Sequence, residues 1–400
     1  MRVLIAASHR NIVGGLEKYL QTLIPGLVKR GHLPGLLYEN AFEAGREAID
    51  SPAIPLDSAC VSDQGLPAVI EWAKEWRPDI VYSHGTESAL EEALLNTFPS
   101  VLYIHTYRGM CISERKCHAY PNVRPCSRPL GAGCLALYLP RRCGGLSPLT
   151  MWREYGLQTE RRNRFSKYRA ILTNSTHMRR ELENNGVESG RVSVLRLPLA
   201  ELAGGALPRS RPFPASEILF VGRLSNVKGA DYLLRAMPEA EARLGRKLRL
   251  TVAGEGPDRQ KLQELARARS INAEFVGWVS SQRRDELMRN AHLLAAPSLW
   301  PEPFGLIGIE AGRFGLPAVG YEVGGIPDWL IPGVSGELAG GNPPTVSGLA
   351  DAIVRAIQDP AHYQKLSEGA SQVAERYSLD DHVLQLETIL SAHSGSRPCS

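Results

Sequence analysis

The sequence predicts an α/β protein made of two units, each a doubly wound parallel sheet covered by helices. Short apolar, β-branched runs alternate with longer polar segments of helical character along nearly the whole chain, which is the pattern of strand–helix–strand repeats. The alternation breaks at residues 199–216, where glycines and prolines are concentrated, as expected for a linker. The chain has 400 residues, of which 43% are hydrophobic, so it is long and apolar enough to build two cores.

The predicted strands are short apolar runs bounded by polar or turn-forming residues, a composition typical of strands that are buried on both faces. In the first half they cover residues 3–7, 35–38, 80–84, 101–105, 170–174 and 192–197. In the second half they cover residues 217–221, 248–253, 273–276, 293–296 and 318–321. The segments between most of them are long enough for the crossover helices that parallel strands require.

These elements divide the chain into four parts. Residues 1–200 form a first domain with an insertion at about 108–169, residues 201–216 form the linker, and residues 217–378 form a second domain. In the last part, residues 379–400, Val383, Leu386 and Leu390 recur with helical spacing, which predicts a helix with one buried face, followed by a tail. We expect this helix to pack back on the first domain.

The insertion shows no clear strand or helix pattern and differs from the rest of the chain in charge. Its arginines and lysines far outnumber Glu114, Glu154 and Glu160, although the whole chain carries a formal charge of only +4. The positive charge is therefore local and indicates a surface for an anionic partner. Together with the apolar run at residues 135–139, it favours an anionic or lipid-linked acceptor at a membrane surface; a solvated basic loop is the alternative.

Five of the seven cysteines lie in this insertion, and their role has three possible explanations. They are Cys111, Cys117, Cys126, Cys134 and Cys143. Five to eight residues separate them, so the close pairs of common zinc modules are missing. A structural zinc ion or iron–sulfur cluster, free buried thiols, and disulfides all remain open.

The amino terminus, MRVLIAASHRN, lacks the long apolar region of a signal peptide, and no run approaches 18 apolar residues. We therefore expect neither secretion nor a membrane span, and predict a cytoplasmic protein, either free or peripheral on the cytoplasmic face of the membrane. A sequence pI of about 8.6 is too weak a bias to predict a nucleic-acid-binding protein.

A first glycine-bearing loop follows the first predicted strand. Gly14 and Gly15 directly precede a helix that is predicted to start near Leu16. Adjacent glycines let backbone amides approach a ligand, and the start of a helix carries partial positive charge. The loop is suited to a phosphate, although a plain tight turn has the same signature.

A second loop follows the strand at residues 217–221. Gly222 and Arg223 leave the end of the strand, and Lys228 stands just before a predicted helix. Two cations at the carboxyl end of a parallel strand are well placed to bind a pyrophosphate. The alternative is a pair of ordinary surface cations.

The segment PSLWPEPFGLIGIEA, residues 297–311, carries two carboxylates around a predicted helix start. Glu302 lies between two prolines, a helix is predicted to begin near Phe304, and Glu310 follows about two turns inside it. The amides that such a start leaves free belong to Gly305, Leu306 and Ile307. These amides would face phosphate or sugar oxygens, with one carboxylate at each end of the ligand.

These motifs resemble those of the retaining glycosyltransferases of family 4, which have the GT-B fold of two Rossmann-like domains facing a central cleft. The matching motifs are Glu302 and Glu310 in E-x7-E spacing, GRLSNVKG at 222–229, GEGP at 254–257, FVGW at 275–278, GGIP at 324–327 and GGLE at 14–17. The resemblance covers nearly the whole chain. It is most specific in the second half, whereas the first half matches mainly through Gly14, Gly15 and His105.

The resemblance implies a role for each matching residue. Arg223 and Lys228 would stabilise the leaving diphosphate. Glu310 would bind the ribose hydroxyls, and Glu302 would bind the donor sugar. His105 would stand near the reacting sugar, although a histidine held in a tight turn is the plain alternative. The remaining donor-binding residues would be Gly14, Gly15, Gly222, Gly254, Val276, Trp278, Phe304, Gly305, Leu306 and Ile307.

The implied activity is sugar transfer from a UDP- or GDP-sugar to a saccharide, lipid-linked or other small acceptor. The chain has no D-x-D motif, so no divalent metal is expected to be required at the diphosphate. The resemblance implies attack on the same face as departure, with the leaving phosphate accepting the proton of the acceptor. One alternative is a GT-B epimerase or phosphorylase. The alternative from another class is a cysteine-rich, metal-binding protein associated with nucleic acid, whereas the leading prediction involves no nucleic acid.

Overall fold

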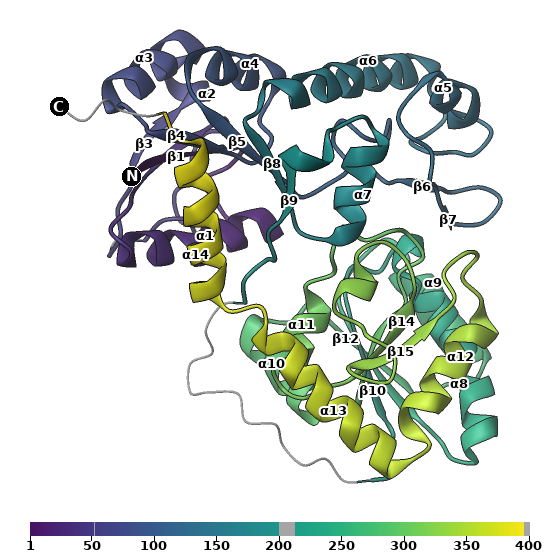
Figure 1. Cartoon of the computed structure of the whole chain (residues 1–400). Coiled ribbons are helices and arrows are strands. Elements are labelled where there is room, and N and C mark those ends of the chain that lie inside the picture. The colour runs from purple at the N-terminus through teal and green to yellow at the C-terminus, as the bar shows by residue number, and fades with distance from the viewer. Residues whose placement is uncertain (52, 200–212, 396–400) are drawn as a thin grey trace.

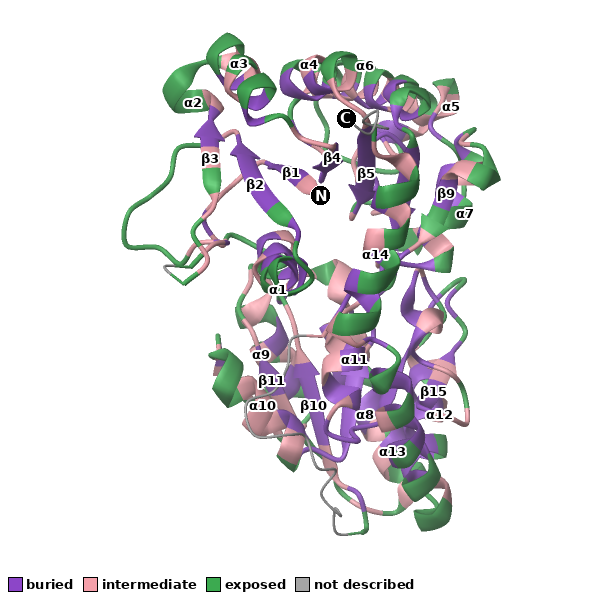
Figure 2. Cartoon of the chain, turned by 60° about the vertical axis from the view of Figure 1, so that its left-hand side comes forward, coloured by how far each residue is buried: buried purple, intermediate pink, exposed green. Residues whose placement is uncertain are grey.

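The computed structural model describes residues 1–51, 53–199 and 213–395, and it contains two lobes, each built on one parallel sheet (Figure 1). The predicted fold class is confirmed. The strands lie among the helices with most of their residues buried, while the outward faces of the helices are exposed (Figure 2). Of the linker predicted at 201–216, residues 201–212 lie outside the described residues.

The first lobe has a seven-stranded sheet in the order β3-β2-β1-β4-β5-β8-β9. The strands are β1 (Arg2–Ala7), β2 (Leu33–Tyr38), β3 (Asp57–Cys60), β4 (Ile80–Ser83), β5 (Ser100–Ile104), β8 (Ala170–Thr173) and β9 (Val192–Val194). The first lobe also contains α1 (Gly15–Lys29), α2 (Val61–Gln64), α3 (Leu66–Trp76), α4 (Ser88–Thr97), α5 (Ala132–Tyr138), α6 (Pro148–Arg164) and α7 (Thr176–Asn184).

The second lobe has a six-stranded sheet in the order β12-β11-β10-β13-β14-β15. The strands are β10 (Glu217–Val221), β11 (Arg249–Ala253), β12 (Ala273–Gly277), β13 (Leu293–Ala296), β14 (Ala318–Tyr321) and β15 (Gly336–Ala339). Its helices are α8 (Ala230–Leu244), α9 (Arg259–Ala268), α10 (Ser281–Asn290), α11 (Ile307–Gly312), α12 (Val346–Ile357) and α13 (Pro360–Glu375).

Both sheets reverse their strand order beside the first strand of the lobe. In the first lobe, β1 pairs with both β2 and β4, and in the second, β10 pairs with both β11 and β13. The loops that leave the carboxyl ends of strands at such a reversal diverge and leave a crevice, which is where open α/β sheets bind ligands. The topology therefore gives each lobe one expected binding crevice.

The insertion has more regular structure than its sequence suggests. It holds a short hairpin of β6 (Cys117–His118) and β7 (Arg124–Pro125), the helix α5, and the 17-residue helix α6. The side chain of Ser147 caps the start of α6, and Pro148 occupies its first turn, both of which favour a helix start. The apolar run at 135–139 is only partly available to a partner, because Tyr138 is buried and Leu135 and Leu139 pack against a small core.

The carboxyl-terminal helix α14 (Leu379–His393) packs against α1 of the first lobe (Figure 1). Its buried face carries His382, Val383, Leu386 and Leu390. The chain therefore passes from the second lobe back to the first at its end. Among the described residues, none of the helices combines the length and the apolar character needed to cross a bilayer.

Candidate functional site

The crevice of the second lobe holds a cavity of about 270 Å³ at the carboxyl ends of β10 and β13. Its lining residues come mainly from the three loops that follow β10, β13 and β14, and include Val221, Gly222, Lys228, Pro297, Ser298, Glu302, Gly305, Leu306, Ile307, Ile326 and Trp329. The structure thus brings Lys228 together with Glu302 and with the three residues whose amides were predicted to face a ligand.

Lys228 and Glu302 form the charged centre of this cavity. The Lys228 Nζ atom lies 2.6 Å from Glu302 Oε1, and both side chains are largely shielded from solvent. Ser298 Oγ donates a hydrogen bond to the same carboxylate oxygen. Among the hydrogen bonds of the described chain, none is donated by the backbone amides of Gly305, Leu306 or Ile307, so these donors are available to a bound anion.

The position of Lys228 depends on tight backbone packing at Gly229. This glycine has a φ of +70°, and an added Cβ atom would lie 1.9 Å from the Pro297 carbonyl oxygen. In addition, Leu299 N donates to Val227 O at 2.8 Å. The loop that carries Lys228 is therefore held directly against the segment that leads to Glu302.

The loop around Glu302 is fixed by both lobes. Tyr107 of the first lobe donates its hydroxyl to the Pro301 carbonyl at 2.6 Å, and Ser175 Oγ donates to the Pro303 carbonyl. Within the second lobe, Gly325 N donates to the Glu302 carbonyl at 2.7 Å. Sequence reasoning missed Tyr107 and Ser175, and no motif in the sequence could have indicated these contacts, because the partners are far apart along the chain.

The helix after this loop begins later than predicted. It starts at Ile307 rather than near Phe304, so Glu310 lies in its first turn instead of two turns inside. The cause is Gly305, whose φ of +90° is incompatible with a helix, while the Phe304 carbonyl accepts a hydrogen bond from Trp329 Nε1.

Glu310 is close to a cation that the sequence analysis did not identify. Its Oε1 atom lies 3.3 Å from an Arg284 guanidinium nitrogen. Burial raises the pKa of the Glu310 carboxyl above its usual range, while Arg284 opposes that shift. A partly desolvated carboxylate of this kind is well suited to accept hydrogen bonds from ligand hydroxyls.

Several predicted donor residues occupy other positions. Arg223 is exposed on the loop after β10, and Trp278 is 77% exposed. Val276 lines a different cavity, together with Glu217 and Arg249. Gly254 packs its backbone against the loop of Gly222. A Cβ atom added to Gly254 would lie 1.9 Å from the Gly222 carbonyl oxygen. The structure therefore does not bring Val276 to the cavity that Lys228 lines.

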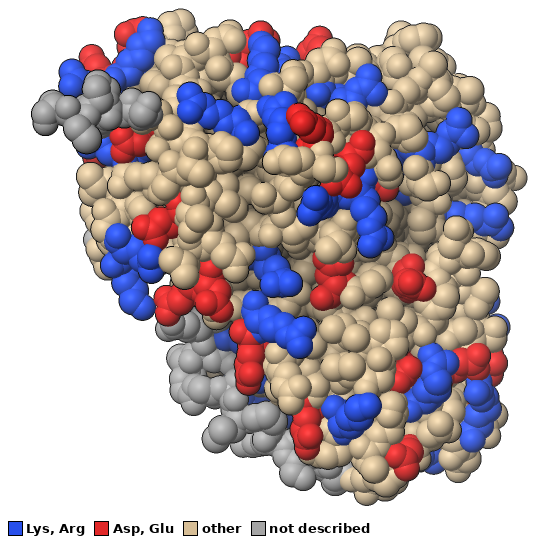
Figure 3. All heavy atoms as spheres, viewed as in Figure 1, with Lys and Arg blue, Asp and Glu red and all other residues tan. Residues whose placement is uncertain are grey.

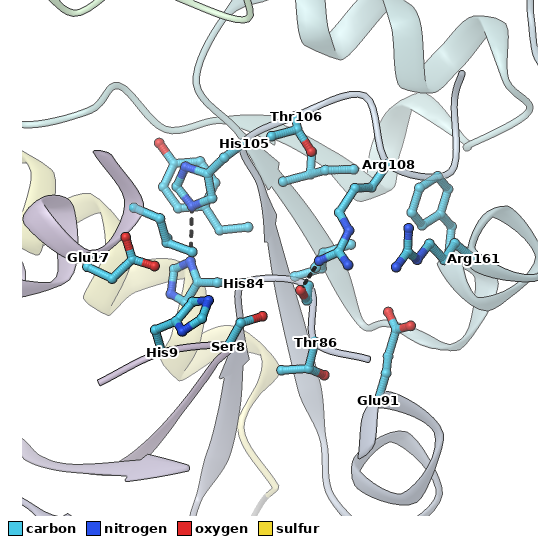
Figure 4. Close-up of a pocket in the computed structure, with 16 residues that line it drawn as sticks. Ser8, His9, Glu17, His84, Thr86, Glu91, His105, Thr106, Arg108 and Arg161 are labelled. Carbon is cyan, nitrogen blue, oxygen red and sulfur yellow. Dashed lines mark hydrogen bonds between the residues drawn. The ribbon is translucent and has the colours of Figure 1, made fainter. Parts of the chain in front are cut away.

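The crevice of the first lobe contains a second cavity of about 270 Å³ at the carboxyl ends of β1, β4 and β5. Its polar lining residues are Ser8, His9, Glu17, His84, Thr86, Glu91, His105, Thr106, Arg108 and Arg161. Figure 4 shows Glu17 and the histidines on one side of this cavity, and Arg108 and Arg161 on the other.

His84, which is buried, and His105, which is half-buried, form a pair in this cavity. His84 Nδ1 and His105 Nε2 are 3.0 Å apart, so one imidazole donates to the other. Burial lowers the pKa of His105 to about 3 and that of His84 well below its ordinary value, and both rings are therefore neutral at pH 7. The His84 Nε2 atom is buried and has no hydrogen-bond partner in the described chain.

The predicted glycine loop of the first lobe lies at the start of α1. Gly14 is the N-cap and Gly15 is the first residue of the helix, and both are exposed. An added Cβ on Gly15 would meet nothing within 4 Å, so a ligand can approach its backbone. Glu17, one turn into the helix, is buried and lines the cavity of His105.

The five cysteines of the insertion line one small cavity of about 20 Å³, and His118 lines it with them. The six cysteines that the structure describes are all free thiols. Burial raises the pKa of Cys117 to about 12. In residues 1–51, 53–199 and 213–395, no three His, Cys, Asp or Glu side chains are grouped as a metal site requires, so metal binding by Cys111, Cys117, Cys126, Cys134 and Cys143 stays a prediction.

Comparison with protein families matches both lobes. Residues 13–198 match the family described as Glycosyltransferase Family 4, and residues 212–373 match the family described as glycosyl transferases group 1. The first match covers β4 and β5, after which the two histidines stand, and the second covers the cavity of Lys228 and Glu302.

Curated relatives are similar over part of the chain. A stretch of 167 residues is 33% identical to an uncharacterised glycosyltransferase of Methanocaldococcus jannaschii. The stretch covers 41% of this chain and 42% of that protein. A stretch of 169 residues is 35% identical to a glycogen synthase of Mycobacterium tuberculosis. The stretch covers 42% of this chain and 40% of that protein. The matches thus span less than half the length of either relative.

Solved structures share the fold over the full length. The lipopolysaccharide outer core galactosyltransferase WaaB superposes with a TM-score of 0.69 at 18% identity, covering 98% of this chain and 99% of that chain. HepE of Anabaena, in complex with UDP and glucose, superposes with a TM-score of 0.67 at 17% identity, covering 98% of this chain and 100% of that chain.

Proposed function

The chain belongs to glycosyltransferase family 4 and has the GT-B fold, and from that membership we propose that it is a retaining hexosyltransferase. It takes a sugar from a UDP- or GDP-sugar and transfers it to a saccharide or lipid-linked acceptor. The observation that carries this proposal is the cavity at β10 and β13, where Lys228, Glu302 and three free amides face one space.

The chemistry of sugar transfer requires positive charge at the leaving group. When the bond between sugar C1 and the diphosphate breaks, negative charge grows on the leaving oxygen and positive charge grows on the sugar ring. Lys228 and the amides of Gly305, Leu306 and Ile307 would stabilise the diphosphate, because fixed donors in a partly desolvated site need little reorganisation. Arg223, which is exposed on the adjacent loop, would add a second cation when the donor is bound.

Glu302 and Glu310 would bind the two ends of the donor. In the structure Glu302 is neutralised by Lys228, so a diphosphate that attracts Lys228 leaves the carboxylate free to accept from a sugar hydroxyl. Glu310, at the other side of the turn amides, would accept from the ribose hydroxyls. This arrangement needs no divalent metal, because a lysine and backbone donors supply the positive charge in a chain without a D-x-D motif.

The cavity of the first lobe would receive the acceptor. His105 is neutral and half-buried there, so it can accept a hydrogen bond from a hydroxyl without adding charge next to the growing cationic sugar. The proton of the attacking hydroxyl would pass to the leaving phosphate on the same face. Neutral histidines suit this step better than imidazolium ions, which would repel the oxocarbenium-like sugar.

The test is slow donor hydrolysis in the absence of an acceptor. The protein is incubated with UDP-, GDP- and ADP-sugars, and the released nucleotide is measured with and without EDTA. We expect release from the UDP- or GDP-sugar, unchanged by EDTA. Lys228→Met should lower the rate by about 10²- to 10³-fold, the usual effect of losing one donor to the leaving group.

Lys247 provides the matched control for that substitution. It is a lysine of the same lobe, its side chain is 82% exposed, and it pairs with Glu241 at 2.8 Å. Lys247→Met should leave nucleotide release unchanged. No release from any of the three donors, or equal rates for the two lysine variants, would overturn the proposal.

A further inference from the structure

Three large apolar side chains are exposed within seven residues at the start of α6. Leu146 is 67% exposed, Leu149 is 83% exposed and Trp152 is 59% exposed. Single exposed apolar residues are ordinary, but a group of them indicates an interaction surface. Leu149 and Trp152 are three residues apart on the helix and therefore lie on one face.

The other side of α6 is already packed against the protein. Met151, Gln158 and Arg161 are buried on that side. Ser147 accepts a hydrogen bond from Thr150 N at 3.2 Å and fixes the first turn. The exposed apolar side chains are thus held on a rigid helix whose packing needs are met elsewhere.

Exposed arginines lie on both sides of this apolar group along the chain. Arg141, Arg142 and Arg153 are exposed, and the Arg142 guanidinium lies over the ring of Tyr120 at 4.9 Å. Tyr120 is itself 51% exposed. Figure 3 shows Lys and Arg side chains gathered along the edge of the molecule formed by the insertion.

The acidic residues of the insertion do not cancel this charge. Glu114 is occupied by Arg161 at 3.0 Å on the inner side of the helix, and Glu154 is paired with Arg153 at 2.8 Å. Glu160 is paired with Arg164 at 3.3 Å. Among the ion pairs of the described residues, none involves Arg141 or Arg142, so these two exposed arginines keep their positive charge.

We propose that Leu146, Leu149, Trp152, Arg141 and Arg142 form a docking surface for an anionic lipid bilayer. The leucines would enter the boundary between headgroups and acyl chains, the tryptophan would lie at headgroup level, and the arginines would pair with lipid phosphates. Charge complementarity favours this partner, because an anionic bilayer offers acyl chains to the exposed apolar side chains and phosphates to the exposed arginines.

The helix that carries the docking surface also contributes to the cavity of His105. Leu149 and Arg161 lie on the same helix, 12 residues and about 18 Å apart at 1.5 Å per residue, and Arg161 lines the cavity of His105. A membrane-anchored acceptor could therefore reach that cavity while α6 rests on the bilayer. This consequence for the acceptor rests on the proposed function, whereas docking itself does not.

Flotation of the full chain with lipid vesicles tests the docking surface without any donor sugar. One set of vesicles is pure phosphatidylcholine. In the other set, about 30% of the phosphatidylcholine is replaced by the anionic lipid phosphatidylglycerol. We expect binding to the anionic vesicles and at least a tenfold lower bound fraction for the double variant Leu149→Ser, Trp152→Ser. Arg141→Gln with Arg142→Gln should weaken binding to anionic vesicles and reduce its salt dependence.

Leu384 supplies the matched control, because it is also exposed, at 49%, but lies on α14 away from the insertion. Leu384→Ser should bind vesicles as the unaltered protein does. Nucleotide release by the double variant should equal that of the unaltered protein, which separates loss of docking from loss of folding or of the proposed activity. Absence of vesicle binding by the unaltered protein, equal binding by the double variant, or a dimer that the same substitutions dissociate would each overturn the proposal.

Discussion

The positions of Lys228 and Glu302 depend on tight packing of the backbone around them. Gly229 lies against Pro297, and Gly324 has a φ of +58° and would place a Cβ atom 2.2 Å from the Glu302 carbonyl oxygen. Both glycines therefore combine a left-handed backbone with a contact that excludes any side chain. At these points the loops of Gly229 and Gly324 each pack against the segment from Pro297 to Glu302.

A pair of glycine substitutions separates these two effects. Gly229 and Gly245 flank α8 and have φ values of +70° and +65°, but Gly245 has nothing within 4 Å of an added Cβ. Gly245→Ala should lower the free energy of unfolding by about 1–2 kcal/mol, the penalty for a left-handed backbone at a residue with a Cβ atom. Gly229→Ala should cost more and should also lower nucleotide release by at least tenfold, because Lys228 is displaced. Urea unfolding and donor hydrolysis measure both; equal losses for the two variants would contradict the packing argument.

His84 is expected to act through His105. His84→Phe keeps an aromatic ring of similar size but removes the hydrogen bond of 3.0 Å between the two imidazoles. A neutral hydrogen bond contributes about 1 kcal/mol, so we expect kcat for transfer to fall about fivefold while KM for the donor stays unchanged. Steady-state kinetics with the identified donor and acceptor test this. A rise in KM for the donor alone would contradict a positioning role.

For single residues, the sequence indicates those that lie together in one motif, but not those that contact the other lobe. Lys228, Glu302 and Gly305 recur in compact motifs, and their structural neighbourhood follows from the strand ends that carry them. Tyr107 and Ser175 contact the Glu302 loop from the other lobe, a relation that depends on how the lobes meet. Val276 lines a cavity with residues of α10 instead of the cavity of Lys228, and which face of a sheet a side chain takes is decided by a single residue of strand register.

Among the helices and strands, those with a strong apolar pattern were predicted from the sequence and the others were not. The buried strands β1, β4, β10 and β13 have strong apolar patterns and were predicted within a few residues. The strands β3 (DSAC) and β15 (GELA) lie at edges of their sheets and are too short and polar to be recognised. The helix α6 was missed because its exposed face also carries apolar residues, so no clean amphipathic pattern remains.

The insertion allows a direct test of the predicted metal. After purification without chelators, a structural zinc ion predicts about one zinc per chain, and an iron–sulfur cluster predicts about two to four irons per chain. Cys117→Ser should lower that amount. Cys60 is also buried and free but does not line the cysteine cavity, so Cys60→Ser is the control and should leave the metal content unchanged. Elemental analysis measures the result. Metal-free, folded protein would contradict the prediction and leave free thiols as the explanation.

The whole molecule should lose stability in mild acid because several histidines are buried in neutral form. Burial lowers the pKa of His105 to about 3 and those of His177 and His382 to about 4, from an ordinary value of 6.5. Below pH 6.5 the unfolded chain binds protons that the folded chain does not. The free energy of unfolding should therefore be fully retained above pH 6.5 and decline toward pH 4, by up to about 1.4 kcal/mol per pH unit for each histidine.

Urea unfolding between pH 7 and 5.5 measures this slope. His382→Gln removes one of the titrating groups and should make the slope shallower, whatever its effect on stability at pH 7. The carboxyl groups titrate mainly below this window and should contribute little to it. A slope that is flat in the unaltered protein, or identical in the variant, would contradict the role of the buried imidazoles.

The return of α14 to the first lobe means that the lobes are joined by two chain segments instead of one. The segments lie next to each other, since Leu199 N donates to Tyr377 O at 2.8 Å. Two adjacent connections restrict twisting of one lobe against the other more than a single connection would. We therefore expect the second connection to limit how far Lys228 of one lobe and His105 of the other can change their relative placement.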